Sequence, residues 1–138
     1  MRHIKKYNES KRFIPYDKIK SEIEDILLDI SDLGITIEIN RQVENINWGL
    51  KMEYISILIY YGNPIDSGIN DKYFRPEGCV EPIEHLLSYA IENEFRGHIK
   101  LVARFGSTSQ DNLHGEKWKK LITCKLKRIE IFLKRHIN

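Results

Sequence analysis

Residues 51–61, KMEYISILIYY, contain the longest apolar run of the chain. Isoleucine recurs at every second position of this run, at 55, 57 and 59. Successive side chains of a β-strand point to opposite faces of a sheet. One face of this stretch therefore carries Ile55, Ile57 and Ile59. The other face carries Tyr54, Ser56, Leu58 and Tyr60. Because both faces are fairly apolar, we expect a strand in the interior of a sheet.

The residues before this strand predict a helix and a second strand. Isoleucines and leucines recur every three or four residues over 16–33, and Gly34 supplies a C-terminal stop. Isoleucine then alternates with Thr, Glu and Asn over 35–40, which is typical of a half-buried strand. We expect a loop over 41–50 to join this strand to residues 51–61 as an antiparallel pair.

The rest of the chain predicts two helices and one more strand. In chain order we expect a long irregular loop over 62–79, a helix over 80–95, a strand over 98–105, a polar loop over 106–115 and a helix over 117–136. The order of elements is then α-β-β-α-β-α. It predicts an α+β fold, with helices packed on a small three-stranded, mainly antiparallel sheet in two layers. Residues 1–14 predict a flexible basic arm, and residues 15–138 a single α+β domain.

Charge is unevenly distributed along the chain. The 138 residues carry a formal net charge of only +2. Residues 1–20 contain seven Lys or Arg against two Asp or Glu, and residues 117–138 contain eight against one. Residues 21–116 contain seven against seventeen. An acidic body between two basic ends favours a negatively charged partner, either a nucleic acid or an acidic protein.

The expected C-terminal helix would gather the second basic segment on one surface. At about 100° per residue, six cations fall in two adjacent columns opposite the apolar side. They are Lys117, Lys120, Lys127, Arg128, Lys134 and Arg135. We expect this stripe to bind the phosphates of a nucleic acid or the carboxylates of a protein groove. The alternatives are a solvated face and neutralisation by the acidic helix over 16–33.

The expected loop over 106–115 offers a second candidate site, for a small anion. Its candidate ligands are Arg104, Ser107, Ser109 and His114. Asp111 and His114 could also form an acid–base pair, with Arg104 as an anion clamp. The spacing matches neither of the glycine-rich phosphate motifs, so an ordinary polar connection is the alternative.

Other side chains give no catalytic or metal signature. The five histidines and two cysteines lack ligand spacing, so we expect no metal and no cofactor. Cys79 precedes the helix over 80–95, where a helix N-terminus lowers a thiol pKa. Carboxylates in the first turn oppose a thiolate there, so we expect a plain thiol. Tyr54 and Tyr60 could stack bases, but packing under a helix or against a partner is the simpler expectation.

These patterns favour binding over catalysis. We expect a small regulatory or inhibitory protein, of a kind that phages encode, that docks on another macromolecule through the basic helix and the loop over 62–79. A nucleic-acid-binding accessory protein is the first alternative, and a small phosphate- or nucleotide-handling enzyme built on residues 104–117 is the second. No secretory signal or membrane span is apparent. We therefore expect the cytoplasm of a bacterium or phage-infected cell.

Overall fold

The structure is a computed structural model that describes residues 14–61, 73–104, 106–120 and 124–137. Apart from Ile14, the expected basic arm lies outside the described residues. So does most of the expected loop over 62–79. Within the described part of the chain, no helix is both long and apolar enough to cross a membrane.

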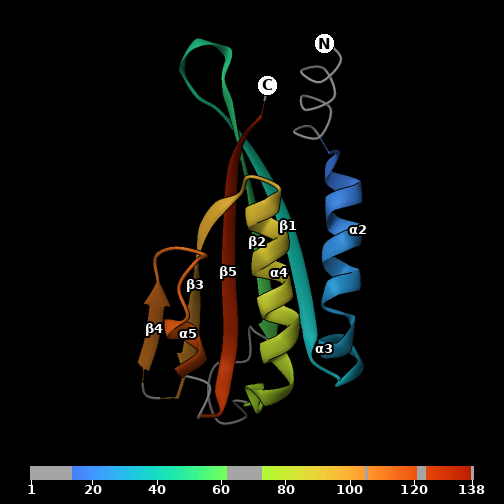
Figure 1. Cartoon of the computed structure of the whole chain (residues 1–138), viewed down its shortest axis with the longest axis vertical. Coiled ribbons are helices and arrows are strands. Elements are labelled where there is room, and N and C mark those ends of the chain that lie inside the picture. Colours follow the sequence, from blue (N-terminus) through green and yellow to red (C-terminus); the bar gives the residue numbers. More distant parts are fainter. Residues whose placement is uncertain (1–13, 62–72, 105, 121–123, 138) are drawn as a thin grey trace.

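A five-stranded antiparallel sheet forms one layer of the fold (Figure 1). In chain order its strands are β1 (Thr36–Asn45), β2 (Lys51–Tyr60), β3 (Arg96–Ala103), β4 (Gly106–Gln110) and β5 (Leu126–Ile137). In space the order is β1-β2-β5-β3-β4, so the last strand of the chain lies in the middle. β2 has a neighbour on each side, as its two apolar faces predict.

Helices pack against one face of this sheet. They are α2 (Tyr16–Ile26), α3 (Leu28–Asp32), α4 (Val80–Glu92) and α5 (Lys117–Lys120). Two short 3-10 turns are also present: η1 (Asn47–Gly49), in the connection between β1 and β2, and η2 (Pro76–Cys79), before α4. The helix predicted over 16–33 is thus interrupted at Leu27 and ends before Gly34, whose φ of +84° suits glycine. The helix predicted over 80–95 is confirmed, although it ends at Glu92.

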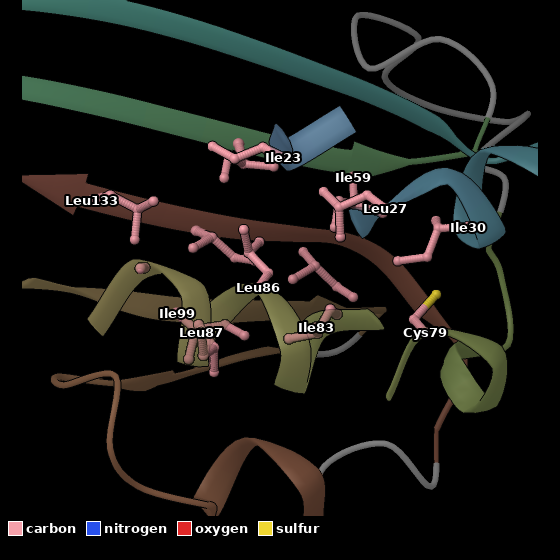
Figure 2. Packing of buried hydrophobic residues seen from close by; sticks show 14 of the residues in the cluster. Ile23, Leu27, Ile30, Ile59, Cys79, Ile83, Leu86, Leu87, Ile99 and Leu133 are labelled. Atoms are coloured by element: carbon pink, nitrogen blue, oxygen red, sulfur yellow. The ribbon is translucent and has the colours of Figure 1, made fainter. Parts of the chain in front are cut away.

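The hydrophobic core lies between the helices and the sheet. Ile23 of α2 and Leu86 of α4 are fully buried, as is Ile59 of β2. Figure 2 shows these side chains in one cluster with Leu133 of β5. Burying each such aliphatic side chain stabilises the fold by about 1.5–3 kcal/mol. This burial fixes which side of β1, β2, β3 and β5 points toward the helices.

The prediction of a helix over 117–136 is wrong. The segment instead forms the four-residue α5 and the twelve-residue strand β5. Within it, Ile129, Ile131 and Leu133 alternate and are at most 1% exposed. β-Branched residues such as isoleucine favour strands. As a strand, β5 places these three buried side chains between the buried side chains of β2 and those of β3.

The sequence predicts that residues 106–110 lie in a polar loop, but they form the edge strand β4, which pairs with β3. β4 is short and mostly exposed, and it consists of polar residues and glycine. It therefore lacks the apolar alternation by which a strand is recognised in a sequence. The sheet therefore has five strands rather than three. The order α-β-β-α-β-α is replaced by α-α-β-β-α-β-β-α-β.

Gly97 allows β3 and β5 to lie side by side. It pairs with Leu133, and a Cβ placed on it would lie 1.7 Å from the backbone oxygen of Phe132. No side chain fits at that distance. Glycine within a strand often marks such a close approach of two backbones.

We predict that Gly97→Ala lowers the free energy of unfolding by about 3 kcal/mol, because β3 and β5 must separate and strain their ladder. Urea denaturation followed by circular dichroism measures the change. Gly106→Ala on β4 is the matched control, since a Cβ there meets no atom within 4 Å. Equal stabilities of the two variants would contradict the close approach.

Candidate functional site

The six cations expected on one helix face do not form a stripe. Lys117 and Lys120 lie on α5, and the other four, Lys127, Arg128, Lys134 and Arg135, are distributed along β5. Because side chains alternate along a strand, Lys134 and Arg135 point to opposite faces. About 23 Å of strand separates Lys127 from Lys134. A helical docking surface is therefore absent from the described part of the C-terminal segment.

Arg135 is held inside the protein by an ion pair with Glu53. The two side chains are 5% and 1% exposed. Arg135 Nε donates to one carboxylate oxygen of Glu53 at 2.7 Å, and Arg41 Nε donates to the other at 2.5 Å. Nη2 of Arg135 donates to the carbonyl of Ile14 at 3.0 Å. The guanidinium also lies 4.5 Å from the ring centre of Phe95. Arg135 is therefore a structural residue.

The residues expected to bind a small anion line two separate hollows. Arg104 and Ser107 line one of about 610 Å³ beside the turn that joins β3 to β4. His114 and Asp111 line another of about 550 Å³ at the opposite end of β4. Ser109 lies between them on β4. Arg104 therefore does not share a hollow with Asp111 and His114, as the acid–base hypothesis required.

Strand pairing collects charged and aromatic side chains on the face of the sheet opposite the helices. We call this the open face. Around its middle it carries Tyr54 of β2, Arg96, His98 and Lys100 of β3, and Arg128, Glu130, Phe132 and Lys134 of β5. The residues between them in sequence, such as Ile55 and Ile131, point into the core.

Phe132 and His98 form an aromatic pair at the centre of the open face. They lie directly opposite each other on β5 and β3. Their rings stack with centroids 4.7 Å apart and an interplanar angle of 29°. Phe132 is 37% exposed, whereas its neighbours Ile131 and Leu133 are buried. An exposed aromatic side chain on a sheet is a surface on which a nucleic-acid base can stack.

Arg96 and Lys134 lie opposite each other on the same face, next to this pair. Like charges directly opposite on neighbouring strands destabilise a sheet. Within the described residues, neither cation has a carboxylate within ion-pair distance. Arg128, further along the face, does bond to Glu130 at 2.6 Å. An anion between Arg96 and Lys134 would relieve their repulsion.

The cation pair and the aromatic pair border the same hollow of about 550 Å³. Its polar and aromatic lining consists of Tyr54, Phe95, Arg96, His98, Asp111, Asn112, His114, Phe132 and Lys134. Sites for small molecules commonly enclose about 300–1,000 Å³. The hollow is thus large enough for a nucleotide-sized group, and it offers that group both rings and positive charge.

Sequence reasoning missed three of these residues. Arg96 lies outside the strand predicted over 98–105, and His98 is its first residue, to which the sequence pattern assigns no role. Phe132 lies within the helix predicted over 117–136, a pattern that does not place it on a sheet face. The alternation of Arg96, His98 and Lys100 with Gly97 and Ile99 is the signal that could have placed the first two on one face.

Gln110 fixes the loop that brings His114 to the hollow. Its buried side chain donates from Nε2 to the carbonyls of Asn112 at 2.7 Å and Gly115 at 2.9 Å. Its Oε1 accepts the N–H of Trp118 at 3.3 Å. Oδ1 of Asn112 in turn accepts the N–H groups of His114 and Gly115, both at 2.9 Å. The loop backbone is therefore held from both sides.

The two layers differ in charge. Residues 16–32 contain six carboxylates against two lysines, and residues 80–92 contain three carboxylates and no Lys or Arg. On β3 and β5, by contrast, the open face carries four cations and the single carboxylate of Glu130. A polyanion is thus repelled by α2, α3 and α4 and attracted to one half of the open face. Of the helices, only α5 is basic, with Lys117, Lys119 and Lys120.

Cys79 and Tyr60 do not offer reactive or stacking groups. Cys79 is fully buried, and burial raises the pKa of its thiol to about 11, so the thiolate is absent at neutral pH. Tyr60 is also buried and donates to Glu38 at 3.0 Å. Burial, and then the Glu38 carboxylate, raise its pKa. The described residues contain no cluster of three His, Cys, Asp or Glu that could hold a metal ion.

Comparisons with known protein families, with curated proteins and with solved structures find no match to this chain. Its function is therefore inferred from the open face itself.

We predict that Glu53→Gln lowers the free energy of unfolding at neutral pH by about 3–5 kcal/mol, because a buried guanidinium loses its counter-charge. Replacing both partners, Glu53→Met with Arg135→Leu, should cost less than Glu53→Gln alone. Urea denaturation measures both. As a control, Glu130→Gln breaks a more exposed pair and should cost less than about 1 kcal/mol. A double variant less stable than Glu53→Gln would show that Arg135 packs rather than pairs.

Proposed function

We propose that this protein binds single-stranded nucleic acid on the open face of its sheet. Bases stack on Phe132 and His98, and the neighbouring phosphates lie against Arg96 and Lys134. The observation that carries the proposal is the juxtaposition of these two cations, which lack a carboxylate partner among the described residues. A phosphate between them converts a repulsive contact into a favourable one.

The spacing of the two pairs suits one nucleotide. Arg96 and His98 are two residues apart on β3, and Phe132 and Lys134 are two residues apart on β5. Two residues of strand span about 7 Å. A base on the ring pair and a phosphate of the same or the next nucleotide can therefore be held together.

The aromatic contact favours a single strand over a duplex. Bases in a duplex are stacked on each other, so their faces are not available to a side chain. Unpaired bases can lie flat on an aromatic ring, and each such contact contributes about 1–3 kcal/mol. The acidic helices α2, α3 and α4 support the same proposal because they repel a polyanion from most of the helical layer.

This proposal replaces docking through a C-terminal helix. Lys134 keeps a binding role, as a residue of β5, whereas Arg135 is buried with Glu53. Lys117 and Lys120 lie on α5, away from the open face. The contribution expected of the loop over 62–79 lies mostly outside the described residues.

We predict that Phe132→Leu weakens binding of a labelled oligouridylate by about 5- to 100-fold, because leucine keeps an apolar strand residue but lacks a flat ring. Fluorescence anisotropy at low salt measures the dissociation constant. Leu28→Ala, at an exposed leucine on α3, is the control and should leave affinity unchanged. Failure of the wild-type protein to bind either oligouridylate or oligothymidylate at low salt would overturn the proposed function.

We also predict that Lys134→Ala reduces the slope of log affinity against log salt by about 0.7, the value of one phosphate contact to a single strand. The same anisotropy titration at several salt concentrations measures it. Lys120→Ala is the matched control, because Lys120 is an equally basic, exposed side chain on α5. If both variants change the slope equally, binding depends on total charge and not on the open face.

A further inference from the structure

Two histidines from different segments line the hollow of about 550 Å³ on the open face. His98 comes from β3, and His114 comes from the loop between β4 and α5. Arg96 and Lys134 line the same hollow. Imidazole is the side chain best suited to give and accept protons near neutral pH. Two imidazoles with two cations are a combination that phosphoryl transfer can use without a metal ion.

The ring of His98 and the backbone of His114 are held in place. The ring of His98 is stacked on Phe132, with centroids 4.7 Å apart. The backbone of His114 is fixed by Oδ1 of Asn112, and Leu113 beside it is only 4% exposed. A catalytic group acts efficiently when its surroundings hold it before the substrate arrives. The hollow is therefore bordered by a stacked His98 ring and by an anchored loop backbone.

The chemistry that fits these groups is cleavage of RNA by its own 2′-hydroxyl. We propose that the hollow catalyses this transesterification, with His98 and His114 as its proton acceptor and proton donor. This inference rests on the proposed binding of single-stranded nucleic acid to the open face. It goes further by assigning a reaction and a substrate class, namely RNA and not DNA.

The reaction balances without a metal, an oxidant or a second substrate. One histidine removes the proton of the 2′-hydroxyl as the 2′-oxygen forms a bond to phosphorus. The bond from phosphorus to the 5′-oxygen breaks, and the other histidine protonates that oxygen. The products are a 2′,3′-cyclic phosphate and a 5′-hydroxyl end. Arg96 and Lys134 stabilise the additional negative charge on the phosphoryl oxygens in the transition state.

Several charged or titratable groups surround the two imidazoles. They are Tyr54 from β2, Arg96 from β3, Asp111 from the loop after β4, and Lys134 from β5. Because one imidazole must be neutral and the other protonated, we expect a bell-shaped dependence of the cleavage rate on pH. A protein that merely binds RNA would not give this profile.

The test incubates the purified full chain with end-labelled single-stranded RNA in EDTA and resolves the products on a denaturing gel. The wild type should release fragments ending in a 2′,3′-cyclic phosphate, and DNA of the same sequence should bind uncut. His98→Phe keeps an aromatic ring against Phe132, so it should retain affinity while cleavage falls at least about 100-fold. His114→Asn should lose cleavage similarly. His85→Asn, at an exposed histidine of α4, is the matched control and should cleave normally.

The outcomes separate the two proposals. Binding of RNA and DNA without cleavage would overturn the catalytic inference and leave the proposed function standing. Absence of binding to either would overturn the proposed function. Cleavage that EDTA abolishes, or that persists at the wild-type rate in both His98→Phe and His114→Asn, would also overturn the assignment of the reaction to these histidines.

Discussion

The central position of β5 constrains the rest of the structure. A strand between β2 and β3 must satisfy backbone hydrogen bonds on both of its sides and side-chain packing on both of its faces. Ile129, Ile131 and Leu133 meet the helical layer, while Phe132 and Lys134 point to the open face. One strand therefore supplies both the middle of the core and the middle of the candidate site.

The same alternation explains why neighbouring cations have different roles. Lys134 and Arg135 are adjacent in sequence, yet Arg135 is buried with Glu53 whereas Lys134 is exposed opposite Arg96. A buried guanidinium needs a counter-charge, which Glu53 supplies. An exposed pair of cations needs none to remain folded, but it favours a bound anion. An anion is thus favoured where strand pairing places Arg96 opposite Lys134 without a carboxylate partner among the described residues.

Local sequence patterns predicted the elements whose periodicity has one interpretation. The helical spacing over 16–33 and 80–95 and the alternation within 35–40 and 51–61 are unambiguous, and those elements are present. The loop predicted over 41–50 is too long, because β1 continues to Asn45 in register with β2. Residues 126–137 fit both a helical and an alternating pattern, because Phe132 and Leu133 are adjacent apolar residues. Residues 106–110 carry no apolar pattern, so edge strand β4 was not recognised. These errors concern strands whose conformation depends on their neighbours.

The sequence by itself determined the apolar segments that form the core, the antiparallel pairing of the first two strands, and an acidic body between basic ends. Only the tertiary structure decided that the C-terminal basic segment is a strand and which of its cations meet a partner. Glu53 and Arg135 are 82 residues apart in sequence, and Arg96 meets Lys134 only through β3–β5 pairing. Contacts of this kind arise from strand register, which is fixed when the whole sheet assembles and is not encoded in any local period.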